Sequence, residues 1–394
     1  MMRVCFVTHY HTLYGANRSL LDLIDGLTPL GVACHVIAPC HGPITEELAK
    51  REIPCVIAPM ECWVSLPGIA VFSGIGRKFK LFRASIQKLY KNRNLLPRLV
   101  HQLKNWQIDL VYTNSSVTPL GAMLASQLKC RHVWHLREFC DLHYGFQYDF
   151  GKWWTQAVIR RADALVAISK AMAHYYTGGA EWSHMHLIYN GVLSRDGFDI
   201  LYKECRAKPS STGQYSFAMI GKLCAAKGQE TAVRALALLK HDFPQARLSI
   251  AGEGEMEPLI RLANELGIGD KVSFLGYVSD PYQVYRQADA LLMCSRYEAM
   301  GRVTAEAMSA CLPVIGYDQA GTSEIIEHER TGLLYRGGPA ELASCMRRLL
   351  EQPEWAEQLG KNGWDVARSR FCIEDYAERI HNVLLNLLQR RASS

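Results

Sequence analysis

The sequence lacks several motifs that would assign it to common functional classes. No two of its 13 cysteines have Cys-x-x-Cys spacing, which argues against zinc-ribbon and thioredoxin-like sites. Scattered thiols are typical of a reducing compartment. No apolar run reaches the roughly 20 residues of a transmembrane helix; the nearest stretch, 63–76, contains one proline and three glycines. The first residues predict a strand rather than a signal peptide, so we expect a cytoplasmic protein.

Acidic residues are missing from one long stretch. Between Cys62 and Ile108 there is no Asp or Glu, yet there are nine basic residues: Arg77, Lys78, Lys80, Arg83, Lys88, Lys91, Arg93, Arg98 and Lys104. A solvated helix face, a nucleic-acid surface and attraction to anionic lipid head groups are the alternatives. No nucleic-acid recognition motif accompanies the charge, so no nucleic-acid partner is expected. Interleaved aromatic residues and leucines slightly favour an anionic membrane surface along 77–104, which would make the protein peripheral on the inner face of the cell membrane.

The remaining composition is that of an ordinary globular protein. Hydrophobic residues make up 49% and charged residues 21% of the 394 residues, which suits two domains. Short apolar runs alternate with helical patterns in both halves, which predicts α/β domains with parallel, doubly wound sheets. The expected strands are Val4–Thr8, Val32–Ala38, Cys55–Ala58, Leu110–Thr113, His132–Leu136, Ala164–Ser169, Phe217–Ile220, Arg247–Ala251, Val272–Leu275, Ala290–Cys294 and Pro313–Gly316.

The composition between Ser194 and Ser216 changes to that of a linker, with Pro209 and Gly213 among polar residues. We therefore expect an N-terminal Rossmann-like domain over 1–200 and a C-terminal one over 201–372. A final helix over 373–394 is expected to pack back on the first domain. Ligands bind beyond the carboxyl ends of the strands in such sheets, so each domain should offer part of a ligand site.

The second half concentrates the residues suited to an anionic, hydroxylated ligand. The segment Gly221–Gly228 follows a strand and includes Lys222 and Lys227, which suits a diphosphate. It lacks the Gly-Lys-Ser/Thr ending of a Walker A loop. Glu298 and Glu306 flank a turn at Gly301, where free helix-terminal amides favour anions. Two lysines near a turn and an acidic first helical turn are also common without function, so these signals count mainly in combination.

In that combination the chain resembles the retaining glycosyltransferases of family 4, which have the GT-B fold. The resemblance rests on the order of Gly-Lys-x4-Lys-Gly, Ala-Gly-Glu-Gly, Phe-Leu-Gly-Tyr, Glu-x7-Glu, Leu-Pro-Val-Ile and Gly-Thr-Ser-Glu between Phe217 and Leu334. The family usually has arginine at the position of Lys222, and lysine keeps the charge without the bidentate fork. Met300 and Cys311 stand where many members have phenylalanine and glycine.

The resemblance implies roles for individual residues. Lys222 and Lys227 would neutralise the donor diphosphate, Glu298 would hold the donor sugar, and Glu306 would meet the nucleotide ribose. His135 matches the family's active-site histidine, although a histidine at a strand end is more often structural. The other expected donor contacts are Gly15, Gly221, Gly254, Val278, Met300, Gly301, Arg302 and Val303.

The implied reaction transfers a hexosyl or N-acetylhexosaminyl group from a nucleotide-sugar to a glycan or lipid-linked acceptor, with retention, in cell-surface polysaccharide biosynthesis. The sequence has no Asp-x-Asp, so we expect no metal and no other cofactor, with the lysines and amides stabilising the leaving group. A nicotinamide oxidoreductase is disfavoured because Gly-x-Gly-x-x-Gly is missing from the first strand–helix turn. A non-catalytic nucleotide-sugar or membrane-surface binding protein of the same fold stays open.

Overall fold

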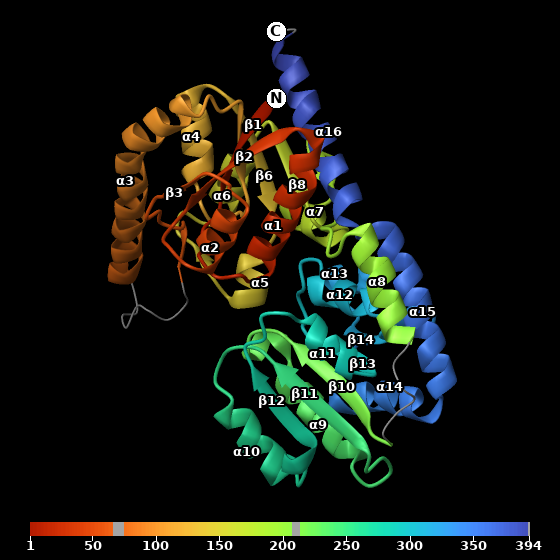
Figure 1. Cartoon of the computed structure of the whole chain (residues 1–394). Helices are drawn as coiled ribbons and strands as arrows, with labels where there is room; N and C mark the ends of the chain where they lie inside the picture. Colours follow the sequence, from red (N-terminus) through yellow and green to blue (C-terminus); the bar gives the residue numbers. More distant parts are fainter. Residues whose placement is uncertain (66–74, 207–212, 393–394) are drawn as a thin grey trace. The chain divides into compact units, whose positions relative to one another are not determined.

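The computed structural model describes residues 1–65, 75–206 and 213–392 (Figure 1). The chain divides into two compact units, one formed by Met1–Gly191 together with Ile373–Ser394, and the other by Val192–Cys372. Each unit is built on its own parallel sheet, so the predicted fold class of two doubly wound α/β domains is confirmed. The first unit ends at Gly191 rather than at residue 200.

The first sheet has seven parallel strands in the order β3-β2-β1-β5-β6-β8-β9. They are β1 (Met2–Val7), β2 (Val32–Ala38), β3 (Cys55–Ile57), β5 (Leu110–Thr113), β6 (Arg131–Leu136), β8 (Ala164–Ala167) and β9 (Met185–Leu187). In the register of the central strands, Val4 of β1 lies opposite Cys34 and Leu110. These strands read as continuous apolar runs because both faces of the sheet are covered. A separate antiparallel pair joins β4 (Val64–Ser65) and β7 (Gln147–Tyr148).

Two helix layers cover the first sheet. The helices are α1 (Gly15–Leu27), α2 (Pro43–Lys50), α3 (Ile75–Asn105), α4 (Leu120–Leu128), α5 (Cys140–Tyr144), α6 (Lys152–Ile159), α7 (Lys170–Thr177) and α16 (Ile373–Ala392), with a 3-10 turn η1 (Thr28–Leu30). Successive side chains of β1 point to the two layers in turn. Phe6 packs with α1 and α16, whereas Val7 packs with α3 and α4. Helices α1 and α16 approach so closely at Gly26 that a Cβ there would lie 2.5 Å from the Ala377 Cβ.

The second sheet has six parallel strands in the order β12-β11-β10-β13-β14-β15. They are β10 (Tyr215–Ile220), β11 (Ala246–Ala251), β12 (Val272–Gly276), β13 (Ala290–Met293), β14 (Val314–Tyr317) and β15 (Gly332–Tyr335). The helices are α8 (Arg195–Arg206), α9 (Gln229–Leu239), α10 (Glu257–Glu265), α11 (Tyr282–Gln287), α12 (Arg302–Ser309), α13 (Ala320–Ile325), α14 (Pro339–Glu351) and α15 (Pro353–Arg370), with 3-10 turns η2 (Ala225–Lys227) and η3 (Gly269–Lys271).

The predicted linker was wrong over most of its described length. Residues 195–206 form α8, which buries Phe198 and Leu201. The Arg368 guanidinium of α15 donates from Nε to Asp199 Oδ1 at 2.8 Å. Tertiary packing of an amphipathic face therefore outweighs the polar composition that predicted a linker. Residues 207–212 of the expected linker lie outside the described part.

Candidate functional site

The strand order of the second sheet places two predicted site residues together. From the central strand β10 the chain moves outward to β11 and β12 and then returns to β13 on the other side. Ligands of open α/β sheets bind beyond the carboxyl ends of the strands at such a reversal of order. Lys227 follows β10 and Glu298 follows β13, so the two side chains flank the reversal point.

Lys227 and Glu298 form an ion pair in which Lys227 Nζ donates to Glu298 Oε1. Their side chains are 18% and 13% exposed. Gly228, with φ of 72°, lets the Lys227 turn lie directly on the end of β13, because a Cβ at Gly228 would come within 2.7 Å of the Cys294 carbonyl oxygen. The glycine of the Lys-Gly motif thus fixes the lysine next to the loop that follows β13.

The loop of Glu298 is held by a close backbone contact. The Gly321 amide donates to the Glu298 carbonyl oxygen at 2.9 Å, and a Cβ on Gly321 would lie 2.6 Å from Met300 Cα. Met300 is buried, and Gly301 caps α12 with φ of 83°. The Gly-Thr-Ser-Glu motif therefore packs against the backbone of the Glu-x7-Glu motif and holds it in place. Val303 lies in the first turn of α12.

Glu306 is buried and both of its carboxylate oxygens are occupied. Arg302 Nε donates to Oε1 at 2.6 Å, and the Tyr285 hydroxyl donates to Oε2 at 3.0 Å. Burial, and then the charge of Glu306, raise the pKa of Tyr285 well above its usual value. Arg302, predicted as a donor contact, here holds Glu306 in place. Tyr285 was missed, because nothing in its sequence surroundings distinguishes it from a core tyrosine.

The glycine turns after β10 and β11 pack on each other. Gly252 has φ of 149°, and a Cβ there would lie 1.9 Å from the Gly221 carbonyl oxygen. A Cβ at Gly254 would lie 2.5 Å from the Leu223 carbonyl oxygen. Side chains at these positions would separate the two turns, so the glycines are needed for this approach.

The remaining second-unit predictions lie around these turns. Gln229 Nε2 donates to the Lys222 carbonyl oxygen at 2.9 Å, while the Lys222 side chain is exposed. Val278 follows β12 and is half-buried. The structure thus fixes the Lys222 backbone and leaves its side chain accessible to a ligand.

In the first unit the strand order reverses between β1 and β5. Gly15 begins α1 there, it is exposed, and a Cβ on it would meet no atom within 4 Å. Asn114 Nδ2, at the end of β5, donates to the Ala16 carbonyl oxygen at 3.1 Å. Gly15 therefore lies near the carboxyl ends of β1 and β5, the edge at which open α/β sheets generally bind ligands.

His135, the fourth predicted catalytic residue, is a fully buried side chain of β6. Its Nδ1 lies 2.7 Å from the Tyr112 hydroxyl, and Nε2 has no hydrogen-bond partner among the described residues. Burial, followed by the charge of Arg137, lowers the pKa of His135 well below its usual value. The ring is therefore neutral at physiological pH, and its role in catalysis stays a prediction.

The stability of the first unit should fall in mild acid. Burial lowers the pKa of His132 to about 4, and His135 is shifted in the same direction. Between about pH 6.5 and 4 these histidines are protonated in the unfolded chain but stay neutral in the folded one. Lowering the pH therefore reduces the free energy of unfolding by up to about 1.4 kcal/mol per pH unit for each histidine. Urea unfolding between pH 7.5 and 4.5 should show this slope. His132→Gln should reduce the slope, whereas replacing the exposed His241 should not; equal slopes in both variants would contradict the assignment.

Comparison with known proteins gives a consistent result for both units. Residues 13–193 match the model of Glycosyltransferase Family 4, and residues 203–365 match that of Glycosyl transferases group 1. The two matches together cover most of the chain, which has the GT-B fold of glycosyltransferases. Among solved structures, HepE of Anabaena, in complex with UDP and glucose, aligns over 98% of this GT-B chain and 99% of its own, with a TM-score of 0.77 and 21% identity. WaaG, a lipopolysaccharide-biosynthesis glycosyltransferase, aligns over 96% and 99% with a TM-score of 0.67 and 17% identity.

Curated relatives match the GT-B chain over part of their length. The putative glycosyltransferase EpsD of Bacillus subtilis is 37% identical over 143 residues, which are 36% of this chain and 38% of EpsD. The lipopolysaccharide core glycosyltransferase LpsD of Rhizobium meliloti is 31% identical over 154 residues, or 39% and 44% of the two chains. The GT-B chain thus spans about two fifths of the length of these relatives.

Proposed function

We propose that the protein is a retaining, metal-independent glycosyltransferase. It would move a hexosyl or N-acetylhexosaminyl group from a nucleotide-diphosphate sugar to a glycan or lipid-linked acceptor in cell-surface polysaccharide biosynthesis. The observation that carries the proposal is the Lys227–Glu298 pair at the strand-order reversal of the second sheet. The description of LpsD as a lipopolysaccharide core enzyme and a HepE complex with UDP-glucose support the acceptor and donor classes.

The paired side chains suit the two chemical parts of such a donor. A bound diphosphate would offer Lys227 a partner of higher charge, which would release Glu298 to accept hydrogen bonds from sugar hydroxyls. Amides at the start of α12 would add preorganised donors toward the same phosphates. Glu306, fixed by Arg302 and Tyr285, would present its remaining acceptor capacity to the ribose.

Charge develops on the leaving phosphates and on the sugar ring during transfer. Lys227, Lys222 and the helix-terminal amides would stabilise the leaving diphosphate without a metal. We assign no separate general base, because the departing phosphate can accept the acceptor's hydroxyl proton on the retained face. The bond from sugar to phosphate breaks as the bond from sugar to acceptor oxygen forms.

A reducing cytoplasmic location is part of the proposal. All 13 cysteines are free thiols, and burial raises the pKa of Cys34, Cys62 and Cys294 to about 12. Such thiols are unreactive at neutral pH, as structural cysteines in a reducing compartment are.

A non-catalytic nucleotide-sugar binding protein is the second candidate. It is favoured by Lys222, which stands where the family usually has arginine, since lysine binds phosphate as a single point charge. Binding without turnover would identify this candidate.

A donor panel in EDTA tests the proposal. We expect one UDP-, GDP- or ADP-sugar to raise the melting temperature and to be slowly hydrolysed, and both effects to be lost in Glu298→Ala. Glu265→Ala, at an exposed position of α10, is the matched control and should behave as the wild type. Hydrolysis that requires added Mg²⁺ would contradict metal independence. A thermal shift without hydrolysis or transfer would favour the non-catalytic candidate.

A further inference from the structure

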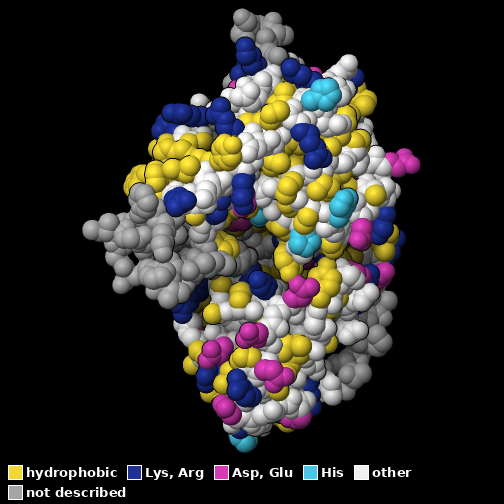
Figure 2. Space-filling model, turned by 90° about the vertical axis from the view of Figure 1, so that its left-hand side faces the viewer, with side chains coloured by type: hydrophobic (Ala, Val, Ile, Leu, Met, Phe, Trp, Pro, Cys, Tyr) yellow, Lys and Arg dark blue, Asp and Glu magenta, His cyan; other side chains and the backbone are white. Residues whose placement is uncertain are grey.

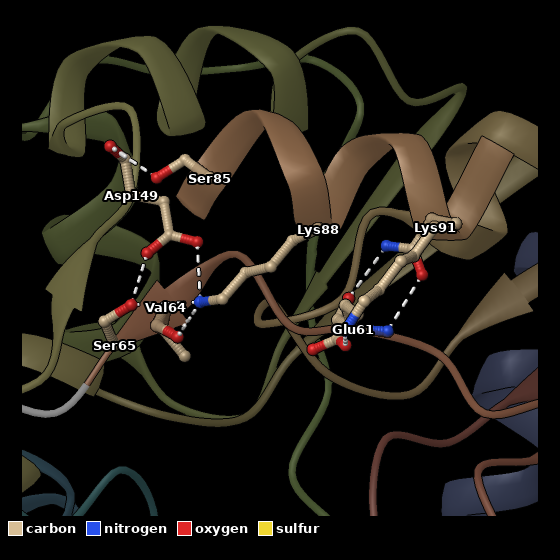
Figure 3. Close-up of polar contacts among 8 residues, drawn as sticks. Glu61, Val64, Ser65, Ser85, Lys88, Lys91 and Asp149 are labelled. Carbon is tan, nitrogen blue, oxygen red and sulfur yellow. Dashed lines mark hydrogen bonds and ion pairs between the residues drawn. The ribbon is translucent and has the colours of Figure 1, made fainter. Parts of the chain in front are cut away.

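Helix α3 is attached to the first unit by polar contacts along its inner side (Figure 3). Lys88 Nζ donates to the Val64 carbonyl oxygen at 3.0 Å, to Ser65 Oγ at 2.9 Å and to Asp149 Oδ2 at 2.8 Å. One turn further on, Asn92 Nδ2 donates to the Glu61 carbonyl oxygen at 2.8 Å. Lys88 was counted among the basic residues available to a membrane; all three of its N–H donors are instead used inside the unit.

These contacts determine which side of α3 faces outward. Phe82, Ile86 and Tyr90 are 54%, 48% and 64% exposed. Their spacing of four residues places them on one side of the helix. Leu96, Leu99 and Leu103 lie on a different side of the helix and pack in the core between α3 and the sheet. Three large apolar side chains in a row on the outer side of α3 thus stay about half exposed or more.

Arginines flank the apolar row. Arg83, Arg93 and Arg98 are exposed, and none of them forms an ion pair with another described residue. By helical spacing all three fall on the outer half of α3. Lys91 differs, because its Nζ lies 2.5 Å from Glu61 Oε1. The side chains of Arg77, Lys78 and Lys80 lie outside the described residues.

A neighbouring helix extends this apolar surface. The Phe150 ring lies 6.4 Å from that of Phe82 and 4.8 Å from that of Trp154, measured between centroids. Next in α6, Trp153 is 87% exposed. On the face that Figure 2 shows, hydrophobic side chains and Lys or Arg side chains lie next to one another on the upper left. Exposed tryptophan and arginine side chains are together typical of protein surfaces at the level of lipid head groups.

We propose that this surface, formed by Phe82, Ile86, Tyr90 and Trp153 with Arg83, Arg93 and Arg98, binds the surface of an anionic lipid bilayer. The charge is complementary, because no Asp or Glu occurs between Cys62 and Ile108. From Phe82 to Arg98 the helix is about 24 Å long, enough to lie flat on a membrane. Among the described residues no helix has the length and apolar content to cross a bilayer. The proposal concerns lipid binding and is independent of sugar transfer.

The aromatic residues separate this proposal from a merely solvated or nucleic-acid-binding face. A solvated basic helix has no use for three large apolar side chains on its outer side. Binding to phosphates alone would need the arginines but not Ile86 or Trp153. A bilayer surface uses both kinds of side chain, since apolar groups enter the head-group region while cations meet the lipid phosphates.

Co-sedimentation of the full chain with vesicles tests the proposal. The probes are phosphatidylcholine vesicles with and without 40% phosphatidylglycerol at low salt. We expect binding to the anionic vesicles only. The triple variant Arg83→Glu, Arg93→Glu, Arg98→Glu should bind the anionic vesicles at least about a hundredfold more weakly than the wild type. A control has the same change of net charge: Lys129→Glu, Arg161→Glu, Arg261→Glu, at exposed positions that form no ion pair with a described residue. It should retain most of the binding.

A second measurement tests the apolar part. Brominated lipids should quench the tryptophan fluorescence of the wild type, and Trp153→Phe should lose most of that quenching. Ile86→Ser together with Tyr90→Ser should weaken vesicle binding while far-UV circular dichroism stays unchanged, because both side chains point outward. Equal weakening by the control and the arginine triple variant would overturn the proposal, as would tighter binding to RNA than to the vesicles or retention of the full quenching in Trp153→Phe.

Discussion

Lys227→Ala should lower turnover about 100- to 1,000-fold while the fold stays intact. A preorganised donor aimed at the leaving group's developing charge contributes about 3–4 kcal/mol to lowering the barrier. Loss of the ammonium also removes the ion pair of Glu298, whose side chain is 13% exposed, so we expect a modest loss of stability as well. The measurement is the rate of sugar transfer or donor hydrolysis at saturating donor, together with the melting temperature.

Two further variants separate the chemical effect from the structural one. Lys203→Ala, at an exposed position of α8 outside the predicted site residues, removes a positive charge and should keep wild-type turnover. Lys227→Ala combined with Glu298→Ala removes the whole pair, so stability should partly recover while activity does not. Near-normal turnover in Lys227→Ala would refute the proposed mechanism.

Leu384→Ala should destabilise the first unit by about 3 kcal/mol and leave the second unit unchanged. Leu384 is a fully buried residue of α16 and packs with β1, α1 and their neighbours in one core. Removing such a side chain costs its transfer free energy and leaves a cavity. Hydrogen exchange should therefore accelerate in β1 but not in β10.

Leu359→Ala is the matched control for this experiment. Leu359 of α15 is 1% exposed in the core of the second unit, so its replacement should accelerate exchange in β10 and spare β1. If Leu384→Ala loosened β10 as much as β1, the division of the chain into units at residues 372 and 373 would be wrong.

The strands show how far sequence reasoning reaches in this protein. Val32–Ala38 and Leu110–Thr113 were predicted with the bounds that the structure has, because β-branched and apolar runs between polar turns leave little choice. Strand β15 and helix α15 were not predicted. Strand β15 is only four residues long, and its sequence Gly-Leu-Leu-Tyr shows no alternation of apolar and polar residues. Helix α8 was assigned to a linker because its polar residues outnumber the few that it buries.

The candidate site was predicted as a set of motifs but not as a geometry. Lys227 and Glu298 are 71 residues apart, and only the order of strands in the sheet brings them together. The part played by Tyr285 in holding Glu306 depends on where α11 lies next to α12, which no local pattern encodes. The buried environment of His135 follows from the crowding of β6 between β5 and β8, and its residue type alone could not distinguish a core side chain from a ligand contact.

Helix α16 has a consequence for the order of events during synthesis. The first unit is completed only by Ile373–Ala392, whereas the second unit is encoded between Gly191 and Ile373. On the ribosome, the second unit can therefore finish folding while the first still exposes the α1 surface that α16 will cover. Domains emerge and fold from the N-terminal end first in most chains; here the N-terminal unit must wait for the last helix. Nascent chains halted before residue 373 would thus expose the apolar surface of α1, and we expect chaperones to bind them.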